Sequence, residues 1–314
     1  MRSTMDPAPV AGFFVRGPSA RRSALQNACA GMFAALALLG GCSSADPAQW
    51  RTGHVDDPTL NEISAIAASR QFPERFWVAA DSGSTATIWM IDAAGTVHRS
   101  VAVDGARNRD WEDMALAEVD GIPTLVIADI GDNLGNRDHA TLYLLPEPDK
   151  DQAAATVVRQ IDFRYPDGPR DAEAVTIDPE AGEILLLSKR DVPPRLYALP
   201  LNPAGAGVVT AEYRRDLDEL PKPTSLDFAL AHTLKSWHWQ PTAMDLGADG
   251  KLAVLTYAGV YLIGAGGGVE RSLKIGGLGI AEAISHGRDS VVVTVEAARA
   301  PVYRIPISAL EDHP

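Results

Sequence analysis

The chain has 314 residues, with 41 acidic against 28 basic side chains and a formal net charge of −13. This balance argues against nucleic acid and against electrostatic docking on anionic lipid, because both require a cationic surface. Gly and Pro are abundant, at 27 and 22 residues, and no long segment has a clean helical period. The roughly 270 residues that follow the first 41 suffice for one large all-β domain or two smaller ones.

Residues 1–41 are predicted to be a lipoprotein signal peptide. The apolar run 24–41 is short and rich in Gly and Ala, which makes it a poor membrane span and a good signal. Arg16, Arg21 and Arg22 lie shortly before it and supply the positive charge of a signal. The run ends in Leu-Ala-Leu-Leu-Gly-Gly directly before Cys42, which two serines follow. This lipobox predicts cleavage before Cys42 and lipidation of its thiol, an anchor that holds stably when more than one acyl chain is added.

Cleavage before Cys42 would remove four arginines and one aspartate, which takes the formal charge from −13 to −16. Cys29 would leave with the signal, so no internal disulfide could form. An uncleaved apolar N-terminus or an ordinary signal cut elsewhere are the alternatives. Arg21-Arg22 loosely resembles a twin-arginine export signal, although Ala24 stands where a large apolar residue is usual. We expect a cell-envelope lipoprotein that faces the periplasm or the cell exterior and touches the membrane only through its lipid.

A short apolar strand recurs five times along the rest of the chain. Its copies are 61–66, 111–116, 172–177, 241–246 and 281–284. A turn and a strongly apolar second strand follow each copy, at 76–80, 125–128, 184–187, 252–255 and 291–295. Third strands come next, at 87–91, 141–145, 195–199, 259–263 and 301–305. Polar fourth strands, typical of sheet edges, are expected at 96–103, 157–163, 208–213 and 269–275.

This repeat predicts an all-β fold, a single β-propeller of five four-stranded blades, because each such sheet can bury its faces only against its neighbours. The last copy lacks a fourth strand, and the segment 49–55 is expected to supply it and close the ring. Residues 42–57 are therefore a tether and closing strand, and residues 58–314 are the propeller, which we expect to be a monomer. A degenerate sixth blade could lie near 216–234, but we interpret that stretch as an inserted loop.

In a propeller, the first strand of each blade lines the central channel and begins at the face where the second strand ends. Side chains from both places should meet at one channel mouth. The first-strand residues are Glu62, Asp110, Glu112, Asp171, Glu173, Thr242 and Glu282. The residues near second-strand ends are Asp81, Asp129, Asp132, Asn133, Lys189, Arg190, Tyr257 and Glu296.

So many neighbouring carboxylates favour a bound hard cation such as Ca²⁺, which takes about 6 to 8 oxygen ligands. The segment 129–133, Asp-Ile-Gly-Asp-Asn, resembles a metal loop in which the glycine lets the backbone turn. The expected calcium ligands are Glu62, Glu112, Asp129, Asp132, Glu173 and Glu282. Alternatively, these acids pair with Arg137, Lys189 and Arg190, or accept backbone N–H groups and only hold the blades together.

Four further mouth residues are expected to contact a ligand: Asp81, Arg190, Tyr257 and Glu296. Lys189 and Arg190 suit an anion such as phosphate or carboxylate beside a metal, or they only neutralise the acids. No histidine spacing organises a zinc site. Neither a G-x-S-x-G elbow nor a cysteine inside the propeller supports a triad hydrolase.

Five motifs together carry a resemblance to known proteins. They are Ala-Asp-Ser-Gly at 80–83, Asp-Trp-Glu-Asp at 110–113, Ala-Asp-Ile-Gly-Asp-Asn at 128–133, Asp-Ala-Glu-Ala at 171–174 and Ala-Glu-Ala-Ile at 281–284. Over residues 57–307 the chain resembles a family of secreted bacterial β-propeller proteins, mostly described as hypothetical lipoproteins. More distantly, it is similar to the esterase-like phytase and strictosidine synthase or lactonase propellers, in which calcium sits at the channel mouth and a phosphate or lactone approaches it.

The distant resemblance implies Glu62, Glu112, Glu173 and Glu282 as cation ligands or general bases. Within it, the catalytic residues are expected to be Glu112, Glu173 and Lys189. The chain departs from the pattern at Thr242, which interrupts the glutamates, and it lacks the dense acidic loops of a calcium phytase. Three functions therefore stay open: binding of a small ligand or envelope protein at an acidic calcium site, metal-dependent hydrolysis of an ester, lactone or phosphate, and a structural role in the envelope.

Overall fold

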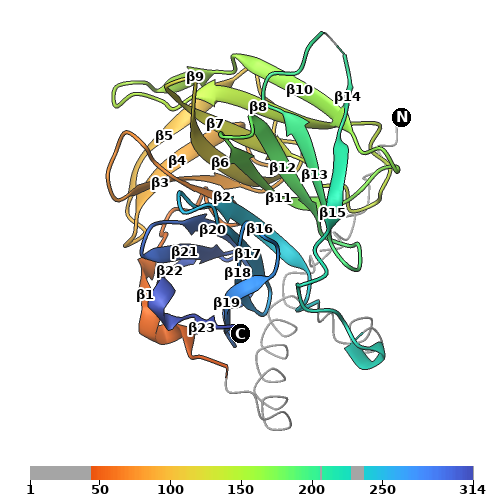
Figure 1. The fold of residues 1–314 in the computed structure, drawn as a ribbon. Coiled ribbons are helices and arrows are strands. Elements are labelled where there is room, and N and C mark those ends of the chain that lie inside the picture. The colour runs from red at the N-terminus through yellow and green to blue at the C-terminus, as the bar shows by residue number, and fades with distance from the viewer. Residues whose placement is uncertain (1–43, 206, 228–236, 314) are drawn as a thin grey trace, which may run out of the picture. The chain divides into compact units, whose positions relative to one another are not determined.

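The computed structural model describes residues 44–205, 207–227 and 237–313, so the predicted signal and Cys42 lie outside the described residues. Within this part, five small sheets are arranged around a ring as a five-bladed β-propeller (Figure 1). The first strands of successive blades contact one another in a closed circle. The prediction of a single five-bladed propeller is confirmed. No helix in the described part is long and apolar enough to cross a membrane.

Each blade has a core of four antiparallel strands. Blade 1 contains β2 (Ile63–Ala68), β3 (Arg75–Ala80), β4 (Thr87–Asp92) and β5 (Val97–Asp104). Blade 2 contains β6 (Trp111–Val119), β7 (Ile122–Asp129), β8 (Ala140–Pro146) and β10 (Arg159–Arg164). Blade 3 contains β11 (Ala172–Asp178), β12 (Glu183–Ser188), β13 (Arg195–Pro200) and β15 (Glu212–Asp216). Blade 4 contains β16 (Pro241–Leu246), β17 (Leu252–Thr256), β18 (Gly259–Ile263) and β19 (Val269–Lys274). Blade 5 contains β20 (Ala281–His286), β21 (Ser290–Val295), β22 (Pro301–Pro306) and β1 (Arg51–His54).

The turns between strands follow local side-chain chemistry. In the hairpin from β11 to β12, the Asp178 carboxylate accepts hydrogen bonds from the backbone N–H groups of Glu180 at 3.1 Å and Ala181 at 2.9 Å. Gly182 then takes a φ of 70°, which costs a glycine little. The aspartate and the glycine thus reverse the chain in a short turn.

The N-terminal strand closes the ring, as predicted. β1 pairs antiparallel with β22, so the described N-terminal segment supplies the outer strand of the last blade. Gly53 lies in this strand, where a Cβ atom would collide with the carbonyl of Ala94 in blade 1. The closing strand therefore fits only because this position has no side chain.

Replacing Gly53 by alanine is expected to destabilise the propeller by about 1 to 3 kcal/mol, because the added methyl must displace backbone. Thermal unfolding of Gly53→Ala against the parent protein measures the effect. Gly266→Ala is the matched control, because its Cβ would meet open space, and it should change stability by less than about 0.5 kcal/mol. Equal melting temperatures for the two variants would contradict a tight closing strand.

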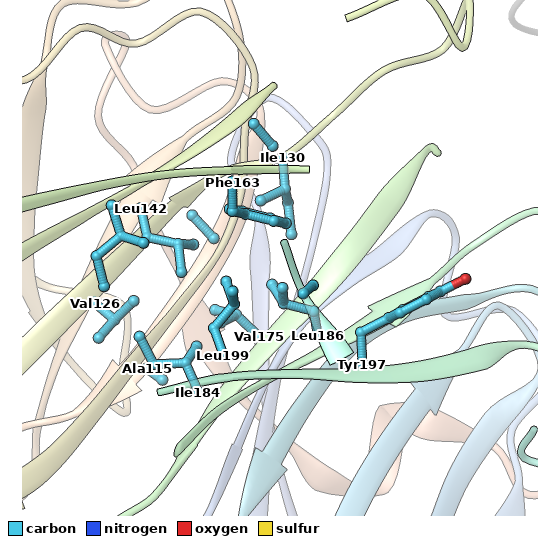
Figure 2. Close-up of a cluster of buried hydrophobic side chains, with 14 of the residues drawn as sticks. Ala115, Val126, Ile130, Leu142, Phe163, Val175, Ile184, Leu186, Tyr197 and Leu199 are labelled. Atoms are coloured by element: carbon cyan, nitrogen blue, oxygen red, sulfur yellow. The ribbon is translucent and has the colours of Figure 1, made fainter. Parts of the chain in front are cut away.

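Five hydrophobic clusters hold the blades together, and each cluster lies between two neighbouring blades. Figure 2 shows the one between blades 2 and 3, where Val126 and Leu142 of blade 2 face Ile184 and Leu199 of blade 3. Another cluster joins blade 5 to blade 1 across the closure. Because no blade has a separate core, the ring is stable only as a whole.

Three sheets carry an additional outer strand from elsewhere in the chain. β9 (Ala154–Thr156) pairs in parallel with β5, β14 (Val209–Thr210) pairs in parallel with β10, and β23 (Glu311–Asp312) pairs with β19. The prediction of one fourth strand over 208–213 was wrong in this detail. The chain bonds to blade 2 at 209–210, Ala211 N donates to Arg164 O at 2.9 Å, and only residues 212–216 join blade 3.

The interpretation of 216–234 as an inserted loop agrees with the structure as far as it describes that segment. Residues 217–227 and 237–240 contain no strand. The rest of the insertion lies outside the described residues. The count of five sheets leaves no sixth blade in the described part of the chain.

Candidate cation site at the channel mouth

The first strand of every blade has a register shift at its beginning, typical of a β-bulge. A bulge adds one residue to a strand and re-aims its side chain. The residues at the five shifts are all buried: Ser64, Glu112, Glu173, Thr242 and Glu282. Three glutamates and two hydroxyl residues therefore occupy equivalent positions around the ring.

Glu62 is not one of these residues. The alignment that matched it to the other glutamates was offset by two positions, since the shift in blade 1 falls between Ile63 and Ala65. Ser64 stands there and donates a hydrogen bond to Trp111 O at 2.7 Å. Thr242 does the same toward Ala281 O at 2.7 Å. Each hydroxyl thus holds the carbonyl directly before a glutamate of the next blade.

The three glutamates form an inner group: Glu112, Glu173 and Glu282 each offer an oxygen within 4.8 Å of the others. Two members have partners on the protein. Lys189 Nζ lies 2.8 Å from Glu173 Oε1, and the Tyr257 hydroxyl donates to Glu282 Oε1 at 2.7 Å. Lys189 Nζ also lies 5.5 Å from the centre of the Tyr257 ring. The predicted catalytic and ligand-binding residues Lys189 and Tyr257 are therefore beside the glutamates.

Glu112 also belongs to an outer group with the half-buried Asp81 and Asp110, again with oxygens within 4.8 Å of one another. Within the part of the chain that the structure describes, neither Glu112 nor Asp110 has a side-chain hydrogen bond or ion pair. A Cβ on Gly131 would collide with Glu112 Oε1 and Asp110 Oδ2. Glycine at this position therefore leaves room for two carboxylates that have no ion-pair partner among the described residues.

Burial and mutual repulsion raise the pKa of these acids. The pKa of Glu112 lies well above its usual range because the group is desolvated and faces Glu173, Asp81 and Asp110. Desolvation and the Asp81 charge raise the pKa of Asp110 to about 6. Burial raises the pKa of Glu173 to about 8, although Lys189 opposes the shift. The site therefore needs either protons or a cation at neutral pH.

The pKa of Glu296 is raised to about 6 by burial and by the charges of Glu282, Glu62 and Asp81. Glu62 and Glu296 therefore lie close enough to the two carboxylate groups to interact with their charges, although neither residue belongs to a group. Arg190 points elsewhere, since it donates from Nε to Asp171 Oδ2 at 2.5 Å and from Nη2 to the side chain of Asn133.

Asp129 and Asp132 lie in neither carboxylate group. Asp129 accepts from Arg137 Nη2 at 2.6 Å and from Arg109 N at 3.0 Å. Asp132 accepts from the backbone N–H groups of Asn136 at 3.0 Å and Arg137 at 2.9 Å. These bonds hold the loop that brings Gly131 to the site, in line with the alternative that some acids pair with Arg137. Their role as metal ligands stays a prediction.

Sequence reasoning placed Asp110 at the mouth but did not count it as a metal ligand. The sequence feature that could have identified Asp110 is the spacing Asp-x-Glu, which occurs at 110–112 and again at 171–173. In the second copy the aspartate is occupied, because Asp171 accepts from Arg190 and from Asp132 N. Only Asp110 keeps a free carboxylate beside its glutamate.

The donor set fits a hard divalent cation. Both groups offer only oxygen ligands, and Ca²⁺ bonds of about 2.4 Å let two ligands of one ion lie up to about 4.8 Å apart. Lys189 already offsets part of the charge at Glu173, whereas Asp81, Asp110 and Glu112 have no cationic partner at hydrogen-bond distance among the described residues. The outer group is therefore the better cation site, with Glu173 and Glu282 beside it.

Fold and site together define a five-bladed propeller in which carboxylates gather where the first strands of its blades begin. No protein-family model and no curated protein sequence matches the chain. Similar solved structures include the major allergen Mala s 1 of Malassezia sympodialis, at 9% identity and a TM-score of 0.50 over 81% of this chain and 96% of that one. Another is a gluconolactonase from Xanthomonas campestris, at 14% identity and a TM-score of 0.44 over 81% of this chain and 75% of that one. At 9% identity, the likeness to the allergen shows the fold alone.

Proposed function

We propose that this protein is a lipid-anchored, extracytoplasmic propeller that binds Ca²⁺ at the channel mouth and, there, a small ligand or an envelope protein. The carrying observation is Glu112, a carboxylate that is 5% exposed, has no side-chain hydrogen bond or ion pair with a described residue, and lies close to four other acids. An unpaired buried carboxylate costs several kcal/mol, so such a group is neutralised by a proton or a cation. Oxygen donors without nitrogen or sulfur select a hard cation.

Calorimetric titration of metal-stripped protein with Ca²⁺ tests the proposal. We expect saturable binding to the parent protein and at least a hundredfold weaker binding to Glu112→Gln, because the variant loses a charged ligand shared by both groups (about 2.7 kcal/mol). Glu118→Gln is the control, since Glu118 is an exposed residue of the same strand, β6. Absence of Ca²⁺ binding in the parent protein, or equal affinity in Glu112→Gln, would favour a purely structural role for the acids.

The second candidate function is hydrolysis of an ester, lactone or phosphate ester. Glu173 favours it, because a carboxyl with a pKa of about 8 beside Lys189 can exchange a proton near neutral pH. A bound cation would supply polarisation of a substrate oxygen. A panel of these substrates, assayed with and without Ca²⁺, should show activity that Glu173→Gln lowers at least about a hundredfold, the lower range for a general acid or base. No activity in the parent protein would leave binding alone.

The lipid anchor at Cys42 is a separate part of the proposal and rests on the lipobox. Cys42→Ala is expected to abolish incorporation of labelled fatty acid and to leave the protein out of the membrane fraction. A variant that still takes up label would contradict the assignment.

A further inference from the structure

A hollow of about 370 Å³ lies beside blade 2, outside the two carboxylate groups. The loop between β5 and β6 forms one wall with Arg107 and Arg109, and Arg137 and His139 form another. Thr141 and Tyr143 of β8 contribute the remaining side. This volume lies within the range of about 300 to 1,000 Å³ that is usual for small-molecule sites.

The loop between β5 and β6 separates cations from acids by alternating its side chains. Arg107 and Arg109 line the hollow. Asn108 turns the other way and donates to Ala80 O at 2.9 Å, and Asp110 joins the outer carboxylate group. The two arginines therefore line the hollow, whereas Asp110 of the same loop belongs to the outer carboxylate group.

Neither arginine has an acidic partner in the described part of the chain. Three other arginines, Arg137, Arg170 and Arg195, do form ion pairs with aspartates. The single carboxylate that lines the hollow, Asp129, is already bound to Arg137. The hollow thus carries surplus positive charge on an acidic molecule. Arg137 Nε adds a buried N–H group without a hydrogen-bond partner in its wall.

We propose that this hollow binds the oxyanion of a small molecule, a phosphate or a carboxylate, between Arg107 and Arg109. A guanidinium presents parallel N–H groups that match two oxygens of such an anion. Because Arg109 directly precedes Asp110, the anion would lie beside the channel mouth. The site stands on its own cations and does not depend on metal binding by the carboxylates.

The two arginines can be replaced without removing the bonds that shape the loop. Arg107 accepts from Trp111 Nε1 through its carbonyl at 2.9 Å, and Arg109 donates to Asp129 through its backbone N–H at 3.0 Å. The double variant Arg107→Gln/Arg109→Gln keeps both. Arg288→Gln is the control. Arg288 is exposed in the hairpin between β20 and β21, which follows the end of β20 rather than its beginning, where the carboxylate Glu282 lies. It makes no ion pair with a described residue.

Metal-stripped protein is titrated with inorganic phosphate and, separately, with acetate, at an ionic strength held constant with chloride. We expect saturable binding and a rise in melting temperature for the parent protein and for Arg288→Gln. In the double variant, affinity should fall at least about tenfold for the loss of two charged donors. Arg109→Lys, which keeps the charge but not the fork, should bind with intermediate affinity.

Stronger binding of phosphate than of acetate would identify a phosphate-bearing ligand, and the reverse a carboxylate. Failure of both anions to bind the parent protein would overturn the proposal, and that outcome does not depend on any variant folding. Equal affinity in the double variant and the parent protein would also overturn it. Loss of Ca²⁺ binding in Glu112→Gln with intact phosphate binding would separate this site from the cation site.

Discussion

Metal-free protein is expected to lose stability as the pH rises from about 5 to about 8, and saturating Ca²⁺ is expected to reverse the loss. The folded state raises the pKa of Asp110 and Glu296 to about 6 and of Glu173 to about 8, above the values of unfolded chains near 4. In this window the folded protein holds protons that the unfolded chain has released. Stability from these groups is therefore complete below about pH 4 and falls as the pH passes through the folded-state pKa values.

Of these three groups, Glu173 should contribute most of the loss, because burial raises its pKa furthest above the value of an unfolded chain. We therefore expect a lower melting temperature at pH 8 than at pH 5 for the metal-free protein. Ca²⁺ binds the ionised carboxylates and so stabilises the folded state most at high pH. Thermal unfolding across the pH range, with and without Ca²⁺, measures both trends.

Glu112→Gln removes the carboxylate shared by both groups, so it should abolish the response to Ca²⁺. Glu173→Gln removes the carboxyl whose pKa is raised to about 8, so it should flatten the pH dependence of the metal-free protein. Glu118→Gln, on the exposed end of the same strand, should retain both. Metal-free stability that increases between pH 5 and 8 would contradict the raised pKa values of the mouth.

The fold could be predicted because its signal repeats. Apolar second strands such as 291–295, turn residues such as Gly182 and a missing fourth strand at the end of the chain all point to one closed ring. The outer strands could not be assigned in the same way. Residues 208–213 read as one polar segment, but the backbone divides them between two blades, and that choice depends on the free edge of β10 rather than on any local pattern.

The candidate site was predictable in its chemistry but not in its register. A bulge leaves no mark in the sequence, so Glu62 seemed equivalent to Glu112 although Ser64 occupies that position. Asp129 was expected to be a metal ligand because it begins the segment 129–133, and its ion pair with Arg137 depends on how that loop folds. Glu112 was identified from the repeat. Its surroundings could be recognised only from the structure, where Gly131 packs directly against its carboxylate.

A different carboxylate, next in sequence to Glu112, ties three blades together. Asp113 is fully buried, and its Oδ1 accepts from Met114 N at 2.8 Å. Its Oδ2 accepts from Val175 N in blade 3 at 2.8 Å and lies 3.5 Å from Met244 N in blade 4. The Asp113 side chain of blade 2 thus accepts hydrogen bonds from backbone N–H groups on the first strands of blades 2 and 3. It also lies close to a backbone N–H group on the first strand of blade 4.

Asp113→Ala is expected to destabilise the propeller by about 3 to 5 kcal/mol, because it leaves buried N–H groups without an acceptor and opens a cavity beside the channel. Thermal and denaturant unfolding measure the loss, and Glu118→Ala on the exposed end of β6 should stay within about 0.5 kcal/mol of the parent protein. Asp113→Asn preserves the shape but turns an amide N–H₂ toward N–H donors, so its loss should be intermediate.

Because Asp113 lies in neither carboxylate group, folded Asp113→Asn should bind Ca²⁺ with the affinity of the parent protein. If Asp113→Asn is as stable as the parent protein but no longer binds Ca²⁺, Asp113 would be a cation ligand and would not stabilise the ring of blades. We therefore expect two adjacent residues of one bulged strand to have different roles: Asp113 stabilises the ring of blades, and Glu112 binds the cation.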